Sequence, residues 1–425
     1  MAELLPDARQ PAIKRILLAT LGSLGDLHPF IALALELKRR GHQLTIASTE
    51  HYRRRVEAFG LSFVPIRPDW DPTDSELIAQ CEDLKTGPEV LFRKLVLPHL
   101  QDSYADLIAP AAGADLIITS ELVFAVPLIA EKLGKRWASV TLSPTSFFSA
   151  HDPSLLVNVP SLYRLRRAGW IVNRAFLNFG RVASRHWWNP VRDLRRQIGL
   201  RAACDPVFKD KFSPSLVLAL FSSVLAQPQP DWPRQTIQPG FVFHDAAPKA
   251  DYDPSVLNEF LREGEPPIVF TQGSTAVHNP GNFYQASLAA ARRVKRRAIL
   301  IGVKDHPPAD DLLAIPYAPF SEIFPHAAAI VHQGGSGTTG QALRAGKPQL
   351  IVPYGWDQPD NGVRIARLSA GLTLARARYT AETATAALRT LLSDTRIAAA
   401  SSQASAILQR ENALQIACNA IEALN

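Results

Sequence analysis

The chain has 425 residues, more than one typical domain needs, and its hydrophobic content of 47% is sufficient for two buried cores. No apolar run approaches the roughly 20 residues that span a bilayer, and the first residues lack the pattern of a secretory signal. The three cysteines have no CxxC spacing, which favours a reducing compartment and argues against a structural zinc site. We therefore expect a soluble, cytoplasmic protein of two domains.

The formal net charge of +7 is concentrated in one segment. Residues 161–201 hold ten arginines against one aspartate, a local charge of +9. Such a patch indicates one local basic surface, and we expect no nucleic-acid partner. Arg167, Arg174, Arg181 and Arg185 recur at helical spacing, which predicts a basic amphipathic helix. Its arginines are either solvated or paired with acids, or they make peripheral contact with an anionic membrane surface.

The first half of the chain alternates between strand-like and helical stretches. Residues 15–21 predict a strand, residues 22–28 a loop, and residues 29–40 a helix with Pro29 in its first turn. Further strands are predicted at residues 43–48, 61–66, 115–119 and 137–142. This alternation is typical of a doubly wound parallel sheet.

A proline-rich stretch interrupts the pattern at residues 227–239, and a new series of strands follows it. These strands are predicted at residues 267–271, 298–302, 328–331 and 349–353. The fold class is therefore α/β, with two Rossmann-like doubly wound parallel-sheet domains. We assign residues 1–230 to the first domain, 231–250 to a linker, 251–400 to the second domain and 401–425 to a C-terminal helix.

The second domain contains a strand, a glycine-rich turn and a helix in immediate succession. The apolar residues 327–331 lead into the segment HQGGSGT that starts at His332, and the helical stretch after it ends at Gly346. Glycines let the backbone approach an anion closely, and the first N–H groups of a helix lack partners and carry the positive end of its dipole. A diphosphate fits such a turn. Lys347 lies past the helix and the GxxxxGK[ST] spacing is absent, which disfavours a P-loop NTPase.

A second strand then delivers a carboxylate and an amide side by side, Asp357 and Gln358. At the carboxyl end of a parallel strand, such a pair accepts hydrogen bonds from the hydroxyl groups of a sugar and donates to them. Glycine loops are common, and an Asp-Gln pair alone can be a solvated loop. The order and spacing of the two features together indicate a site for a nucleotide sugar.

HxGGxGT followed by DQxxN resembles the nucleotide-sugar signature of family 1 glycosyltransferases of the GT-B architecture, in which two Rossmann-like domains face a cleft. The chain is similar in particular to bacterial members such as rhamnolipid rhamnosyltransferases, and to sterol glucosyltransferases. The resemblance implies that the C-terminal helix returns to the first domain. It also implies that the donor is held by His332, Gly334, Gly335, Ser336, Gly337, Thr338, Asp357, Gln358 and Asn361.

The resemblance further implies a catalytic base in the first loop. In the family, the residue three positions before the proline of this loop removes the acceptor proton, and that residue is Asp26 here. Capping the helix is the alternative role of Asp26, and His28 can supply either the cap or the base. Glu121 stands where family members place the acid that supports a catalytic histidine; beside an aspartate it either binds the acceptor or lies on a surface loop. An aspartate with the ordinary pKa of about 3.9 is a weak base.

Further donor contacts follow from the same resemblance. Ser274 closes the first loop of the second domain and is expected beside the departing diphosphate. Tyr317 and Ala318 stand where the family usually has Trp-x-Pro, so Tyr317 either stacks on the nucleotide base or is a plain core aromatic. No metal or other cofactor is expected, because the helix dipole and the backbone donors supply the positive field.

The sequence thus predicts an inverting, metal-independent hexosyltransferase that uses a UDP- or TDP-sugar. Its acceptor is expected to be hydrophobic and hydroxylated (phenolic, sterol-like or lipid) and to lie near residues 143–148. The alternatives are a TDP-rhamnose-dependent rhamnosyltransferase acting on a hydroxyacyl lipid and a non-catalytic nucleotide-sugar-binding relative. A dehydrogenase is disfavoured because residues 22–25 give GxxG and not GxGxxG. The DxD at residues 69–71 lies outside the expected donor half, and chance explains it better than metal binding.

Overall fold

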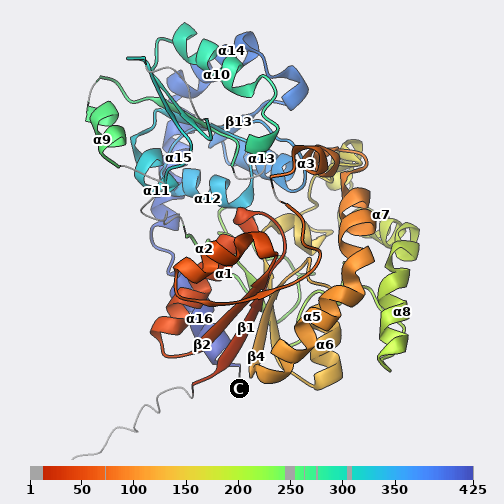
Figure 1. Ribbon diagram of the computed structural model, residues 1–425. Coiled ribbons are helices and arrows are strands. Elements are labelled where there is room, and N and C mark those ends of the chain that lie inside the picture. The colour runs from red at the N-terminus through yellow and green to blue at the C-terminus, as the bar shows by residue number, and fades with distance from the viewer. Residues whose placement is uncertain are drawn as a thin grey trace, which may run out of the picture.

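The computed structural model describes residues 13–71, 73–244, 254–262, 264–273, 276–303 and 309–424. Two lobes are visible in Figure 1, and each contains one parallel β-sheet. Both faces of the first sheet are buried, since Ile16 and Leu18 of its strand β1 join one hydrophobic cluster while Leu17 and Ala19 join another. Parallel sheets require such cover on both faces, so the predicted α/β class with two doubly wound domains is confirmed.

The first sheet has seven strands in the order β3-β2-β1-β4-β5-β6-β7. Their bounds are β1 (Arg15–Ala19), β2 (Gln43–Ser48), β3 (Ser62–Pro65), β4 (Leu116–Ser120), β5 (Trp137–Thr141), β6 (Leu216–Ala219) and β7 (Thr236–Ile237). The second sheet has six strands in the order β10-β9-β8-β11-β12-β13. Their bounds are β8 (Ile268–Thr271), β9 (Ala298–Ile301), β10 (Leu312–Ile315), β11 (Ala329–His332), β12 (Gln349–Ile351) and β13 (Gly371–Thr373).

Helices connect most of these strands. In the first half they are α1 (Leu24–Arg39), α2 (Arg53–Ala58), α3 (Ser75–Glu82), α4 (Gly87–Glu89), α5 (Leu100–Gly113), α6 (Ala125–Leu133), α7 (Trp170–Ala183) and α8 (Asn189–Gln197). In the second half they are α9 (Pro254–Arg262), α10 (Phe283–Arg293), α11 (Phe320–Ile323), α12 (Ser336–Arg344), α13 (Gln358–Arg367), α14 (Ala381–Ser393), α15 (Thr395–Leu408) and α16 (Ala413–Glu422). Within the described ranges, no helix combines the length and the apolar character that crossing a bilayer requires.

The C-terminal segment forms two helices, and the second of them packs on the first domain. Ala417 and Ile421 of α16 are fully buried in the same cluster as α1. Glu422 pairs with Arg40 at 2.7 Å and lies 3.0 Å from His42. Figure 1 shows this blue helix among the red elements of the first domain. Helix α16 is thereby part of the hydrophobic core of the first domain.

The structure differs from the sequence prediction at the start of α1. The helix begins at Leu24, five residues before the predicted start, because Ser23 caps it: the Ser23 hydroxyl accepts from the Gly25 N–H at 3.1 Å. Pro29 therefore lies inside the helix, where it leaves one backbone hydrogen bond unmade.

Four short strands were not predicted, namely β6, β7, β10 and β13. Runs of two to four residues are too short to show a period. β7 lies inside the predicted linker of residues 231–250 and pairs with β6, so the first sheet extends into that segment.

The packing of α16 gives a direct stability prediction. Ile421→Ala removes a fully buried side chain, and we expect the free energy of unfolding to fall by about 2–5 kcal/mol. Ile416→Ala on the same helix is the matched control, because Ile416 is 42% exposed; its effect should stay within about 0.5 kcal/mol. Denaturant titration measures both, and equal effects would contradict this packing.

Candidate functional site

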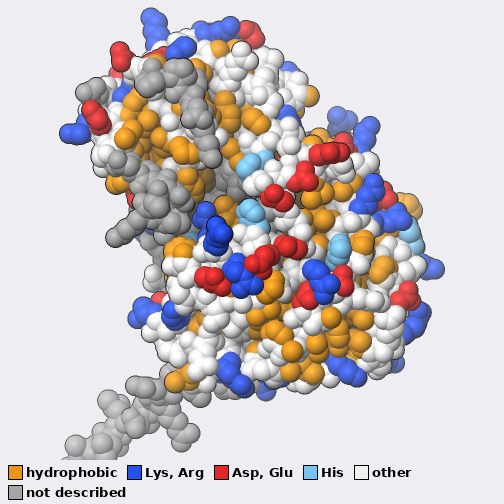
Figure 2. Space-filling view, in the orientation of Figure 1, with side chains coloured by type: hydrophobic (Ala, Val, Ile, Leu, Met, Phe, Trp, Pro, Cys, Tyr) orange, Lys and Arg blue, Asp and Glu red, His pale blue; other side chains and the backbone are white. Residues whose placement is uncertain are grey.

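The predicted site residues lie at the carboxyl ends of strands from both sheets. Asp26 follows β1 and Glu121 follows β4 in the first domain, while His332 ends β11 and Asp357 follows β12 in the second. On the face shown in Figure 2, acidic side chains gather near the junction of the two lobes. Crevices at the carboxyl ends of parallel strands are where α/β proteins bind ligands.

Asp26 completes the capping box of helix α1 together with the N-cap Ser23, and it is at the same time half-buried in the site. Its Oδ2 accepts from the Ser23 N–H at 2.7 Å and from the Ser23 hydroxyl at 3.1 Å. Gly22 has a φ of 134°, and a Cβ atom at this position would collide with the Asp26 carboxylate. The backbone at Gly22 therefore leaves the space that the carboxylate occupies.

The pKa of Asp26 is raised to about 6, mainly because burial penalises its charge, with a smaller contribution from the nearby charge of Glu121. This differs from the ordinary value assumed from the sequence. Glu121 accepts from the Ser146 hydroxyl at 2.5 Å and from the Lys211 ammonium at 2.7 Å. Lys211 is 5% exposed and lies over the Phe148 ring at 5.2 Å. Both Glu121 oxygens thus have partners, and the carboxylate acts on Asp26 through its charge.

His28 lies on a different side of α1 from Asp26. Two helical positions separate them, which corresponds to roughly 200° about the helix axis. The His28 ring meets the His244 ring edge-on, with 5.6 Å between ring centroids. Burial, together with the nearby His244, lowers the pKa of His28 to about 3, so the imidazole is neutral.

His332 is completely buried and holds the glycine-rich turn from within. Its Nδ1 accepts from the Gly334 N–H at 3.1 Å, so its Nε2 carries the proton and donates to Gln349 Oε1 at 2.9 Å. Burial lowers the pKa of His332 to about 4. Gly334 has a φ of 92°, and a Cβ atom there would lie 2.6 Å from Ile351 Cγ2. His332 therefore holds the turn through Nδ1 and is anchored to strand β12 through Nε2.

Helix α12 starts directly after this turn, with Gly335 as its N-cap. No side chain caps this end, and Gly337 is exposed in the first turn. Thr338 is buried, and the Ser336 hydroxyl donates to the Leu142 carbonyl of the first domain at 2.5 Å. The N–H groups of the first turn therefore face the junction of the two domains without a competing side-chain acceptor.

Asn361 connects the glycine-rich turn to the predicted sugar-binding pair. Its Nδ2 donates to the Gly334 carbonyl and to Asp357 Oδ2, both at 2.9 Å. Gln358 Oε1 accepts from the Tyr354 and Gly355 N–H groups at 2.8 and 3.2 Å. Asn361 is fully buried and acts as a brace, whereas the Gln358 amide nitrogen and the second Asp357 oxygen are the groups left for a ligand.

The segment before Asp357 packs on the first domain, where Trp356 contacts the hydrophobic cluster that contains Leu21. The pKa of Asp357 is raised to about 7, chiefly by burial, and the charge of Asp26 adds to this shift. Asp26 therefore lies within electrostatic range of Asp357, although one residue belongs to each domain. The structure thereby brings the predicted base and the predicted sugar-binding residue into one site.

A buried ion network fixes this juxtaposition. Asp360 and Arg364 of α13 pair at 2.7 Å, and both are almost inaccessible. From the first domain, the Leu155 N–H donates to Asp360 at 2.7 Å, the Thr145 hydroxyl donates to it at 3.3 Å, and Asp152 pairs with Arg364. The helix that begins at the Asp-Gln pair is therefore clamped to the other domain.

The remaining sequence predictions concern Tyr317, Ala318, Ser274 and the DxD at residues 69–71. Tyr317 is half-buried and Ala318 is buried, and both follow the carboxyl end of β10. Ser274 lies outside the described residues. Asp69 accepts from the Glu50 N–H and Asp71 from Thr73, so both have local roles. Among the described residues, no group of three or more His, Cys, Asp or Glu side chains is arranged to hold a metal ion.

Sequence reasoning missed Lys211, Gln349 and the Asp360–Arg364 pair. Gln349 gave a local signal, because it is a polar residue opening an apolar strand, and it is completely buried. Lys211 gave no local signal, because its partner Glu121 lies 90 positions away in the sequence.

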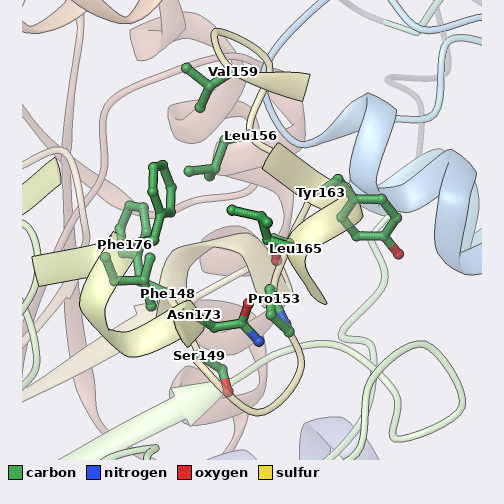
Figure 3. Close-up of a pocket in the computed structure, with 11 residues that line it drawn as sticks. Phe148, Ser149, Pro153, Leu156, Val159, Tyr163, Leu165, Asn173 and Phe176 are labelled. Carbon is green, nitrogen blue, oxygen red and sulfur yellow. The ribbon is translucent and has the colours of Figure 1, made fainter. Parts of the chain in front are cut away.

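An apolar pocket adjoins the site on the side of the first domain. It encloses about 30 Å³ and is lined by residues of two segments, 148–165 and 173–177. Figure 3 shows Phe148, Leu156, Leu165 and Phe176 around it, with Ser149 and Asn173 as polar neighbours. Phe148 separates the pocket from Lys211, so the pocket lies one side chain away from the Glu121 pair.

Two family models match the chain. Residues 16–145 match the glycosyltransferase family 28 N-terminal domain, and residues 303–419 match the erythromycin biosynthesis protein CIII-like C-terminal domain. The O-mycaminosyltylonolide 6-deoxyallosyltransferase of Streptomyces fradiae is 33% identical, covering 96% of this chain and 97% of that protein. A sterol 3-beta-glucosyltransferase of Arabidopsis thaliana is 28% identical, covering 83% of this chain and 56% of that protein.

Solved structures show the same fold. Spinosyn forosaminyltransferase SpnP superposes with a TM-score of 0.72 at 20% identity, covering 97% of this chain and 99% of that one. Glycosyltransferase VinC in complex with dTDP superposes with a TM-score of 0.65 at 22% identity, covering 97% of this chain and all of that one.

The geometry of the glycine-rich turn gives a second prediction. Gly334→Ala places a Cβ atom against Ile351 at a positive φ, and backbone strain alone should lower the free energy of unfolding by about 1–2 kcal/mol. Gly337→Ala is the control, since its Cβ atom would meet nothing within 4 Å. Thermal unfolding without nucleotide compares the two, and an unchanged midpoint for Gly334→Ala would rule out the described turn.

Proposed function

The chain belongs to the GT-B glycosyltransferases, and from this premise we propose that it transfers a hexose from a TDP- or UDP-sugar to a hydroxyl group of a hydrophobic acceptor, with inversion at the anomeric carbon. The observation that carries this proposal is the packing of Trp356, next to Asp357, against the first-domain cluster that contains Leu21, which brings Asp357 within electrostatic range of Asp26. One carboxylate comes from the domain expected to bind the acceptor and the other from the domain expected to bind the donor.

In the proposed reaction, Asp26 accepts the proton of the acceptor hydroxyl while the acceptor oxygen attacks the anomeric carbon. The bond from that carbon to the diphosphate oxygen breaks, and the nucleoside diphosphate leaves with the electron pair. A carboxylate with a pKa of about 6 is a better base than an ordinary aspartate and is still roughly 90% ionised at pH 7. The attack comes from the first domain, opposite the leaving group on the second, which accounts for inversion.

The departing diphosphate is proposed to lie at the start of α12. The N–H groups of residues 335–338 and the positive end of the helix dipole supply a field that grows in importance as charge develops on the leaving oxygen. Ser274 is proposed as an additional donor and Tyr317 as the stacking face for the base. We propose no metal for this step, because these donors serve the same electrostatic purpose.

We propose that the sugar is oriented by the polar groups of Asp357 and Gln358 that are not used in the hydrogen bonds described above. The free oxygen of Asp357 accepts from a sugar hydroxyl, and the Gln358 amide nitrogen donates to the neighbouring one. Asn361 acts on the sugar only indirectly, by holding Asp357 against the glycine-rich turn.

Thymidine diphosphate is the favoured nucleotide, because the structures of VinC and of spinosyn rhamnosyltransferase SpnG were solved with it. A natural-product or sterol-like acceptor is favoured by the names of the relatives, and the apolar pocket of Figure 3 provides the matching surface. At about 30 Å³ the pocket must widen to admit such a compound. The alternative of a TDP-rhamnose-dependent rhamnosyltransferase differs in the sugar and in its hydroxyacyl lipid acceptor. The two carboxylates of the site argue against a non-catalytic binder.

An assay that crosses TDP- and UDP-sugars with sterol, phenolic, macrolide and hydroxyacyl acceptors tests the proposal. We expect acceptor-dependent release of nucleoside diphosphate, and Asp26→Asn should reduce turnover by about 100-fold to 10,000-fold. Because the side-chain oxygen of the introduced asparagine can still accept from Ser23, the helix cap and the binding of TDP should be retained. Asp71→Asn is the control for a metal-binding DxD and should keep full activity. Retained turnover in Asp26→Asn would disprove its role as the base.

The raised pKa of Asp26 predicts the acidic limb of the pH profile. The base must be ionised, so kcat/KM should approach its plateau above about pH 7, fall to half of it at about pH 6 and then approach a tenfold decrease per pH unit at lower pH. An ordinary aspartate would place this limb near pH 4. Initial rates from pH 4.5 to 8.5 measure it, with circular dichroism as the control for folding. A rate that stays flat down to pH 4.5 contradicts the assignment.

A further inference from the structure

Helix α7 turns an apolar stripe toward solvent. Ile171, Phe179 and Val182 are 67%, 71% and 63% exposed, whereas the buried residue of this helix is Asn173. Together with Ala175, the exposed residues are spaced by four, four and three positions, so they lie on one side of the helix. A surface helix normally turns such a stripe to the core. A contiguous exposed patch of this kind marks a binding surface.

Arginines surround this stripe. Arg164 and Arg167 precede the helix and Arg185 follows it, and within the described part of the chain none of the three forms an ion pair. Arg174 and Arg181 lie along the helix, paired with Asp231 at 3.4 Å and Asp205 at 2.6 Å, yet each remains nearly half exposed. The patch therefore combines apolar and cationic groups.

The position of α7 leaves the patch accessible. Figure 1 places α7 and α8 at the outer edge of the first domain, and Figure 2 shows basic and hydrophobic side chains interspersed along that edge.

We propose that the outer face of α7 docks on an anionic lipid surface. The apolar stripe enters the boundary between headgroups and acyl chains, as amphipathic helices with basic flanks do. Trp170, half-exposed at the start of the helix, is the type of side chain that prefers this boundary. The unpaired arginines at both ends of the helix contact the headgroup phosphates.

Charge disfavours a second copy of the chain as the occupant of this face. In a twofold dimer the same patch meets itself, so the arginines around one stripe would be placed against those around the other. Like charges in such an interface oppose association. An anionic surface, by contrast, complements every cation in the patch.

The helix also separates this face from the apolar pocket. Asn173, Phe176 and Leu177 line the pocket from the inner side of α7, as Figure 3 shows for Asn173 and Phe176. Docking would therefore place the pocket one helix away from the lipid, where a lipophilic acceptor is concentrated. This consequence rests on the proposed function, whereas the docking itself does not.

Vesicle flotation tests the proposal with the full chain. We expect flotation with vesicles of phosphatidylcholine and phosphatidylglycerol, and none with phosphatidylcholine alone. Phe179→Ser with Val182→Ser should weaken partitioning at least about tenfold. Replacing Arg164, Arg167 and Arg185 by glutamine should weaken it roughly 100-fold, since each cation near an anionic surface contributes about tenfold or less.

Matched variants control for general hydrophobicity and charge. Ile407→Ser with Ile416→Ser changes two exposed apolar residues elsewhere, and Lys85→Gln, Lys94→Gln and Arg389→Gln change three exposed cations. Both control sets should float like the wild type.

The proposal is overturned if the wild type floats with neither kind of vesicle. It is also overturned if the control sets lose as much partitioning as the α7 variants. A dimer in light scattering that the Phe179 and Val182 changes dissolve would assign the face to a second copy instead. Transfer activity on a soluble acceptor is measured in parallel: its absence from the wild type would count against the proposed function and not against docking, and its retention in the variants shows that they are folded.

Discussion

The buried ion pair between Asp360 and Arg364 holds helix α13 against the first domain, and the geometry of the site depends on it. Each of these charges has a partner on the opposite domain, Asp152 among them. Removing one partner from such a network leaves a buried charge uncompensated, which typically costs about 3–5 kcal/mol. Because α13 begins directly after Asp357, the clamp determines where the sugar-binding pair stands relative to Asp26.

This closeness is itself electrostatically unfavourable. Burial and the charge of Glu121 raise the pKa of Asp26 to about 6, and burial and the charge of Asp26 raise that of Asp357 to about 7, so each carboxylate is less stable in its charged form than in water. In the proposed function, a donor sugar relieves part of this cost when its hydroxyl groups hydrogen-bond to Asp357. The same burial makes Asp26 a stronger base. The Asp360–Arg364 network thus holds the two domains in an arrangement that destabilises these two charged carboxylates but suits the proposed reaction.

The local features of this protein could be predicted from its sequence, and the contacts between distant segments could not. The turn after His332 and the Asp357–Gln358 pair were predicted because glycine spacing and apolar runs lie within one continuous segment. Lys211 approaches Glu121 from 90 positions away, and nothing in either neighbourhood indicates that contact. The early start of α1 was missed because Pro29 is more common in a first turn than inside a helix. The raised pKa of Asp26 depends on burial and on the charge of the distant Glu121, which have no signature in the sequence.

The central claim is that the second domain binds a diphosphate through the backbone at the start of α12, opposite Asp26. A crystal structure of the chain with TDP tests it most directly. In that structure, both phosphates should lie within hydrogen-bond distance of the N–H groups of residues 335–338. The terminal phosphate should lie on the side that faces Asp26. Phosphates bound elsewhere, or at this turn but directed away from the first domain, would contradict it.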